Sequence, residues 1–281
     1  MLYNIENILG VAAVQLCLGL IKGLDMEPIT QLRHIKAAGF DGFFALWEQP
    51  GQLDVLAAEA KQLGLMFQSV HAPFRKTTSL WEQGEAGELA LRELLDCLED
   101  CRRLSIPVMV SHVFMGFEVQ EPNDLGLERF SRLFAAANKA GVRIALENVE
   151  SIPHLQYLLE RCGNPHIGLC WDSGHAHCYN LNYDLLNAYG HRLIATHLND
   201  NFGVTDPDGV ISKHDDLHLL PFDGTLNWDA VAAQLRSYNG PLTFELSVKN
   251  YNMPPADFFR LAYRRACQVA AKRGNYGISS Y

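Results

Sequence analysis

The fold is best read from RIALENVESIPHLQYLLERCGNPHIGLCWDSGHAHCYNLNYDLLNAYGHRLIATHLND, residues 143–200. This stretch contains three short apolar runs, at 143–149, 167–172 and 193–200, and two longer helix-like segments between them, at 151–162 and 182–189. Short apolar runs that alternate with helix-length segments are typical of β-α-β units with a parallel sheet. Runs that are apolar almost throughout indicate strands buried on both faces.

The same alternation extends over the rest of the chain. Further apolar runs lie at 11–18, 40–47, 66–73, 108–114 and 241–247. Further helix-like segments lie at 27–38, 53–63, 87–104, 124–140, 227–237 and 255–273, several of them followed by glycine, a favoured helix stop. This strict alternation predicts an α/β fold, a (β/α)8 TIM barrel that forms one domain over residues 1–281. An open doubly wound sheet is the alternative.

The composition describes a globular protein with ample material for a core. Of its 281 residues, 48% are hydrophobic and 20% are charged. The formal net charge of −9 gives no help in gathering phosphate backbones, so a nucleic-acid partner is not expected. The seven cysteines form no C-x-x-C pair, and free thiols in this number indicate the reducing cytoplasm.

The apolar run from Leu9 to Leu20 resembles a targeting segment only superficially. No basic residue precedes it, and Glu6 lies where a signal peptide has its basic region. The run is too short, and too interrupted by Gly10, Gln15 and Gly19, to span a bilayer. We therefore expect a first barrel strand here and no membrane association.

Acidic and imidazole side chains recur at the ends of the predicted strands. They are His71, His112, Glu147, Asp172, His175, His197 and Glu245, with Asp216 and His218 in the long segment after the seventh strand. An unpartnered group of this kind is costly inside an apolar run. In a barrel, however, the C-terminal strand ends share one rim, so these residues are expected around one pocket.

A divalent metal is the expected cofactor of that pocket. The predicted ligands are Glu147, Asp172, His197 and Glu245. Carboxylate and imidazole groups are suitable ligands for Mn, Mg, Co or Zn, and a cation would relieve the repulsion among the three carboxylates. A single strand-end histidine is more often a hydrogen-bonded structural residue; the coincidence of so many groups at equivalent places favours metal binding.

Six motifs in order along the chain carry a family resemblance. They are SVHAP (69–73), ALENVE (145–150), CWDSGHAH (170–177), THLNDN (196–201), DLHLLPFDGTLNW (216–228) and TFEL (243–246). Together they resemble the xylose isomerase-like TIM barrel superfamily. That superfamily includes sugar and sugar-phosphate isomerases and epimerases, and the endonuclease IV-type enzymes, or AP endonuclease family 2.

The resemblance implies roles for individual residues. Glu147, Asp172, His197 and Glu245 match the metal ligands of the ketose epimerases, among which Glu147 and Glu245 are the proton-transfer carboxylates. His175 matches a substrate-oxygen contact of that branch. In the endonuclease branch, the same four residues match part of a three-zinc set that also includes His71, His112, His175, Asp216 and His218.

Two reaction classes follow from these roles. In an isomerase or epimerase, a metal chelates the carbonyl and the neighbouring hydroxyl of a ketose, and carboxylates move a carbon-bound proton through an enediolate. A multi-metal phosphoesterase instead uses clustered metals to generate hydroxide. Leu217 stands where the endonuclease branch prefers Arg, and Asn201 begins a segment where it favours Lys, so the isomerase or epimerase is the leading prediction.

Two further alternatives stay open from the sequence. An inosose-type dehydratase would abstract the same proton and then lose water. A non-enzymatic protein that binds sugar or metal would exchange no proton at all.

The predicted substrate is a sugar or a sugar phosphate. Trp47 and Phe74 lie near strand ends and are candidates for an apolar wall against a sugar face. Arg75 and Lys213 are candidates for holding a substrate phosphate. By analogy with the family, a homo-oligomer is compatible with the sequence.

Overall fold

The strands of the computed structural model, which describes residues 14–21, 23–118 and 120–274, form one parallel sheet. They are β1 (Leu16–Gly19), β2 (Gly42–Leu46), β3 (Met66–His71), β4 (Val108–His112), β5 (Arg143–Glu147), β6 (Ile167–Asp172), β7 (Leu193–His197) and β8 (Leu242–Phe244). Neighbouring strands pair in the order β7-β6-β5-β4-β3-β2-β1-β8. A parallel bridge between Leu198 and Phe244 joins the two ends of this order. The predicted TIM barrel is therefore confirmed.

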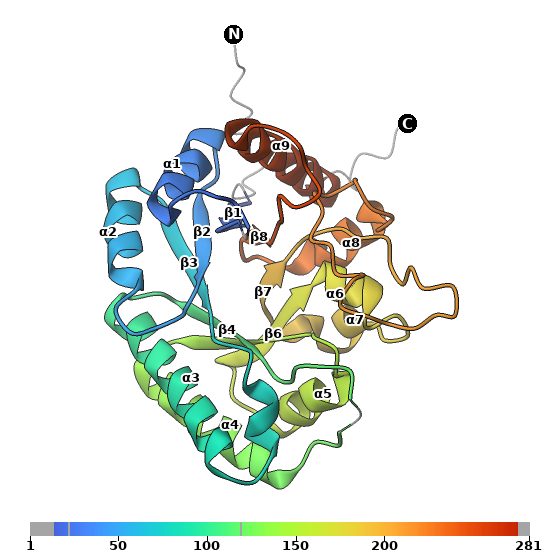
Figure 1. Cartoon of the computed structure of the whole chain (residues 1–281). Helices are drawn as coiled ribbons and strands as arrows, with labels where there is room; N and C mark the ends of the chain where they lie inside the picture. The colour runs from blue at the N-terminus through green and yellow to red at the C-terminus, as the bar shows by residue number, and fades with distance from the viewer. Residues whose placement is uncertain (1–13, 22, 119, 275–281) are drawn as a thin grey trace.

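Helices surround the ring of strands (Figure 1). They are α1 (Pro28–Ala38), α2 (Leu53–Leu63), α3 (Glu85–Arg103), α4 (Asp124–Ala140), α5 (Ile152–Arg161), α6 (Ser173–Cys178), α7 (Leu185–Tyr189), α8 (Trp228–Gln234) and α9 (Pro255–Gly274). Three short 3₁₀ segments complete the connections: η1 (Thr77–Trp81), η2 (Gly190–Arg192) and η3 (Leu235–Ser237). η3 falls within the predicted helix-like segment 227–237, whereas η1, η2 and α6 were not expected from the sequence, since each is too short to show a helical repeat.

Most strands are shorter than their predicted ranges. The part of the first predicted strand that falls on residues 11–13 lies outside the described residues; β1 begins at Leu16. The seventh was expected to run to Asp200, but β7 ends at His197. Leu198 still bridges to Phe244, and two residues further on the buried Asp200 pairs with Leu219 of the following long segment.

Two apolar clusters form the core. The larger lies between the strands and the helices, whereas the smaller consists of Val108, Val110, Ala145, Cys170, Ile194 and Ala195. Positions 110, 145, 170 and 195 each lie two residues before the end of their strand. Because strand side chains alternate between faces, they share the interior face with the residues that end those strands. The small cluster thus forms the floor beneath the polar strand ends.

All seven cysteines are free thiols. Cys97 and Cys101 are buried on α3, and burial raises the pKa of Cys97 well above its usual range. Within the part of the chain that the structure describes, no helix has the length and apolar character to cross a lipid bilayer.

Gly126→Ala is expected to destabilise the fold. Gly126 lies in α4, where an added Cβ would come 2.0 Å from Cε3 of the buried Trp81. Overpacking of this kind typically lowers the free energy of unfolding by about 1–3 kcal/mol. Urea denaturation measures the loss, with Gly163→Ala as the control, since nothing lies within 4 Å of a Cβ built there. Equal stability of the two variants would contradict the packing described for α4.

Candidate metal centre

Five consecutive strands end at a side chain that can bind a metal. These residues are His71 on β3, His112 on β4, Glu147 on β5, Asp172 on β6 and His197 on β7. Glu245 is the first residue after β8. Strand pairing sets Glu147 beside His112, and His197 beside Asp172. The parallel register therefore brings residues that are distant in sequence to one rim of the barrel.

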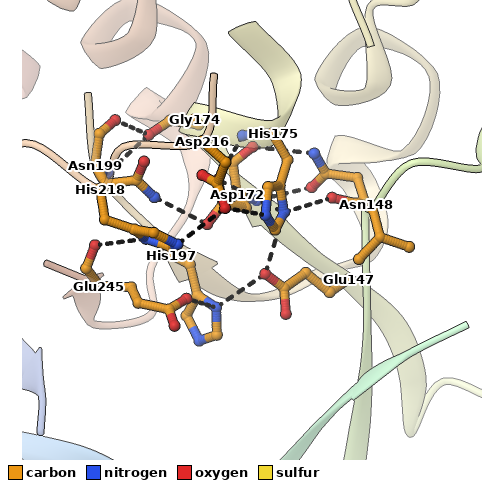
Figure 2. Close-up of polar contacts among 12 residues, drawn as sticks. Glu147, Asn148, Asp172, Gly174, His175, His197, Asn199, Asp216, His218 and Glu245 are labelled. Carbon is orange, nitrogen blue, oxygen red and sulfur yellow. Dashed lines mark hydrogen bonds and ion pairs between the residues drawn. The ribbon is translucent and has the colours of Figure 1, made fainter. Parts of the chain in front are cut away.

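Four of these residues meet closely enough to share one cation. They are Glu147, Asp172, His197 and Glu245, called the quartet below. One donor atom from each lies within 4.8 Å of the other three. Nδ1 of His197 lies 3.2 Å from Oε1 of Glu147 and 3.1 Å from Oε2 of Glu245. Figure 2 shows the region in which these side chains approach one another.

The donor set of the quartet fits a divalent cation. Three carboxylates and one imidazole are all at least nine-tenths buried, which is costly without a compensating positive charge. Oε2 of Glu147 and Nε2 of His197 are buried, and neither atom has a hydrogen-bond partner among the described residues. Buried groups of this kind are rare unless an ion or water completes them. Oxygen and nitrogen donors together suit Mn, Mg, Co or Zn.

The electrostatics of the quartet reflect burial and mutual contact. Burial raises the pKa of Asp172 to about 6, and the nearby charge of Glu147 adds to the rise. Burial opposes the charge on both Glu147 and His197. The attraction of His197 outweighs burial for Glu147, and the combined effect of Cys170, Glu147 and Glu245 outweighs it for His197. The pKa of Glu147 consequently falls well below its usual range, and that of His197 rises well above. Without metal, His197 therefore serves as the counter-ion of the carboxylates.

Metal affinity is expected to fall as the pH is lowered. A ligating carboxylate must be ionised and a ligating imidazole must be neutral, so a bound cation displaces any proton that these groups carry. Asp172 carries a proton below a pH of about 6, and His197 keeps its proton up to a higher pH. Each displaced proton weakens binding about tenfold per pH unit. Calorimetric titration with Mn²⁺ at pH 7.5 and 5.5 measures the effect, with circular dichroism to confirm folding. Equal affinity at the two values would contradict the proposed ligand set.

Three further groups of potential ligands occur among the described residues. One of them, Glu147, Cys170 and His197, shares two members with the quartet, and the other two flank it. The first of these two is His71, His112 and Glu147, which we call the inner cluster, and the second is His175, Asp216 and His218, the outer cluster. Nε2 of His71 and of His112 lie 3.2 Å and 3.4 Å from Oε2 of Glu147. Burial lowers the pKa of His112 to about 4, so its ring is neutral near pH 7 and available as a ligand.

The outer cluster contains a partly buried ion pair. Oδ2 of Asp216 lies 3.4 Å from Nε2 of His175 and 3.1 Å from Nε2 of His218. Burial opposes the charge on His175, but Asp172 and Asp216 together raise its pKa well above the usual range. His218 has the left-handed φ of +49°, a conformation in which histidine is uncommon, and such strain is often found at functional sites.

Two asparagines hold Asp172 of the quartet in place, and little in the sequence points to them. Asn148 donates to the carbonyl of Asp172 at 3.0 Å and accepts from its N–H at 2.7 Å. Asn199 donates to Oδ2 of Asp172 at 3.0 Å, while the other oxygen caps α6 by accepting from the N–H of His175. Gly174 permits this arrangement, since a Cβ there would come 2.0 Å from Oδ1 of Asn199. Each asparagine lies one or two residues after a ligand, which is the only signal in the sequence.

The long segment between β7 and α8 contributes Asp216 and His218 of the outer cluster (Figure 1, orange). Asp200 anchors it: its carboxylate accepts from the N–H groups of Phe222 and Leu226 and from Nε1 of Trp228. This fully buried carboxylate thus fixes the return of the loop, from which Asp216 and His218 reach the metal side of the rim.

A cavity of about 160 Å³ opens beside Glu147 and Glu245 of the quartet. It is lined by His71, Phe74, His112, Met115, Glu147, Val149, Glu150, His175, Tyr179, Lys213, Asp216, His218 and Glu245. Phe74 and Lys213, two of the predicted substrate-binding residues, thus belong to it. Trp47 and Arg75 instead line a neighbouring groove, and Phe74 lines both the groove and the cavity. Nε1 of Trp47 donates a hydrogen bond to Asp100 at 2.8 Å.

The cavity also contains residues that the sequence did not single out. Tyr179 stacks on His175 with ring centroids 5.1 Å apart, and Met115 comes from the loop after β4. Glu150 lies three residues after Glu147 in the ENVE motif. An acidic residue so close in sequence to the proposed ligand Glu147 is a signal from which Glu150 could have been predicted as a cavity residue.

Comparison with known proteins identifies relatives of this architecture. The family model described as xylose isomerase-like TIM barrel matches residues 32–266. The uncharacterized protein y4fM of Sinorhizobium fredii is 31% identical over 205 residues, which cover 67% of this chain and 61% of that protein. The chain therefore spans under two thirds of the length of this relative.

Solved structures share the fold at low sequence identity. The IOLI protein with a binding zinc atom is 18% identical with a TM-score of 0.75, over 94% of this chain and 100% of that one. The 3-keto-D-glucoside 4-epimerase YcjR from E. coli is 18% identical with a TM-score of 0.70, over 91% of this chain and 99% of that one. At these identities the likeness shows the fold alone.

Proposed function

The chain belongs to the xylose isomerase-like TIM barrel family, and we propose that it is a divalent-metal-dependent isomerase or epimerase of a sugar or a sugar phosphate. The observation that carries this proposal is the quartet. It contains two glutamates, from β5 and from the end of β8, whose oxygens lie within 4.8 Å of each other beside one cavity. Two carboxylates on separate strands suit the removal and return of a proton at a carbon between them.

Glu147, Asp172, His197 and Glu245 would hold the metal. When bound, a divalent cation polarises a carbonyl and stabilises the negative charge that develops on its oxygen. Glu147 and Glu245 then divide the proton transfer: one carboxylate removes the proton next to the carbonyl, and the other returns it. Return to the opposite face of the same carbon gives epimerisation, and return to the neighbouring carbon gives isomerisation.

His175 is placed to bind a substrate oxygen. Its Nδ1–H donates to the carbonyl of Asn148 at 2.9 Å, which fixes the ring and leaves Nε2 on the side of Asp216 and the cavity. The raised pKa keeps this ring protonated near pH 7, so Nε2 can donate a hydrogen bond. A donor in this position stabilises an oxygen that gains negative charge.

The similar structures support this proposal. YcjR is a sugar epimerase, and IOLI was solved with zinc, so this fold accommodates both features that the quartet suggests. Their low identity leaves the reaction of the present chain to experiment.

A multi-metal phosphoesterase is the second candidate. The observation that favours it is the geometry of the inner and outer clusters, which provide ligand sets on either side of the quartet. Three metals held in this way would activate a hydroxide and stabilise a leaving oxygen. Leu217 and Asn201, which stand where basic residues would bind a phosphate backbone, weigh against DNA as its substrate.

Proton exchange tests the leading proposal. The protein, loaded with Mn²⁺, is incubated in deuterated water with a panel of ketoses, and deuterium next to the carbonyl is detected by mass spectrometry. Exchange that depends on metal is the expected result. Metal-dependent release of phosphate from phosphoesters, without exchange in any ketose, would replace the leading proposal with the second candidate.

A further inference from the structure

Glu150 lines the cavity but has no part in the proton transfer proposed above. It lies in the turn between β5 and α5, three residues beyond Glu147. Its Oε2 is buried and, within the described residues, has no hydrogen-bond partner. Burial raises the pKa of this carboxyl, and the N–H groups of Glu150 and Gly116 oppose the rise. An acceptor oxygen without a hydrogen-bond partner is therefore left over in a residue that lines the cavity.

Glu150 does not belong to any of the potential metal sites. The quartet, the inner cluster and the outer cluster all form without it among the described residues. Its contacts also differ from those of a structural ion pair, because no arginine, lysine or histidine of the described chain lies within 4.0 Å of it. A buried acceptor without a partner costs free energy unless a bound molecule satisfies it.

The charges of the cavity determine which molecule suits that acceptor. Four carboxylates line the cavity, namely those of Glu147, Glu150, Asp216 and Glu245. Two cations stand against them among the described lining residues: the exposed Lys213, and the ring of His175, which pairs with Asp216. Arg75, the other candidate for holding a phosphate, lines the neighbouring groove instead. A cation in the quartet would contact Glu147 and Glu245 directly, but Glu150 and Asp216 are outside the quartet.

From this arrangement we propose that Glu150 accepts a hydrogen bond from a substrate hydroxyl, and that the enzyme therefore takes an uncharged polyhydroxy carbonyl compound and not a phosphate ester. This inference rests on the proposed function for the carbonyl chemistry. A hydroxyl satisfies the buried oxygen of Glu150. A phosphate in the same place would set its own acceptor oxygens against the acceptor oxygen of Glu150, and its negative charge would be repelled by that of the carboxylate.

Binding of two non-reacting polyols tests the inference without requiring catalysis. Calorimetric titration of the Mn²⁺-loaded protein compares glucitol with glucitol 6-phosphate, neither of which has a carbonyl to react. The wild-type protein is expected to bind glucitol more tightly. Glu150→Ala is expected to weaken glucitol binding about tenfold or more, the effect of losing a hydrogen bond to a charged group. Glu150→Gln, which keeps an acceptor oxygen, is expected to recover part of the loss.

Glu118→Gln is the matched control, because Glu118 is an exposed carboxylate that does not line the cavity. It should bind glucitol as the wild type does, and all variants should keep the wild-type metal content. Tighter wild-type binding of glucitol 6-phosphate would overturn the inference. So would undetectable glucitol binding, or Glu150→Ala with unchanged affinity. Failure of proton exchange in the ketose panel, with these binding results intact, would count against the proposed function only.

Discussion

Glu245→Gln is expected to reduce the rate of proton exchange in a responsive ketose by about a thousandfold. A positioned acid or base typically accelerates proton transfer by about 10²–10⁴-fold, and glutamine cannot take up or release the proton. The substitution keeps the size of the side chain and one oxygen near Nδ1 of His197. Deuterium incorporation by the metal-loaded protein measures the loss, and metal content measured on the same sample separates proton transfer from metal binding.

Glu147→Gln should cause at least as large a loss. Glu147 belongs to the quartet and to the inner cluster, and its side chain is fully buried. Its replacement therefore removes one proton-transfer group and perturbs two ligand sets. Glu118→Gln serves as the exposed control. Exchange at the wild-type rate in either quartet variant would refute the division of proton transfer between two carboxylates.

His197→Ala is expected to remove the stabilisation that a divalent metal gives the fold. A cation present at about a hundred times its dissociation constant stabilises the native state by about 2.7 kcal/mol. Nδ1 of His197 lies close to both glutamates of the quartet and is the proposed imidazole ligand of the metal, so the variant should bind metal far more weakly. Thermal or urea unfolding of wild type and variant, each with and without Mn²⁺, measures the difference.

A control substitution at His154 separates the effect of losing a metal ligand from the effect of losing a packed aromatic ring. His197 is fully buried and stacks on Phe44 at 4.7 Å, so its truncation also destabilises the metal-free fold. His154 is also fully buried and stacks on Phe114 at 4.3 Å, but it is in none of the potential metal sites. His154→Ala should lose packing yet keep the full response to metal. An equal response in both variants would rule out His197 as a ligand.

The barrel and the polar strand ends could be predicted from the sequence for one physical reason. Parallel strands carry their C-terminal ends to one rim, so a residue that ends a strand has a known neighbourhood before any distance is known. Glu147, Asp172 and His197 illustrate this, since each ends its strand and register pairs Asp172 directly with His197. The same reasoning placed Glu245, although it lies one residue beyond β8.

Residues in loops were less predictable, because loop conformation depends on contacts that no periodic pattern records. Phe74 and Arg75 are adjacent in sequence, yet only Phe74 reaches the cavity. Glu150 follows the strand end by three residues and was overlooked for the same reason. The anchoring role of Asp200 depends on partners more than twenty residues away, such as Phe222 and Trp228.

The central claim is that side chains from distant parts of the chain share one cation at the rim of the barrel. Anomalous diffraction from crystals grown with Mn²⁺ tests it most directly. The expected result is an anomalous peak in contact with Glu147, Asp172, His197 and Glu245 together. A map without a peak among these four side chains, or with metal only at other positions, would contradict the claim.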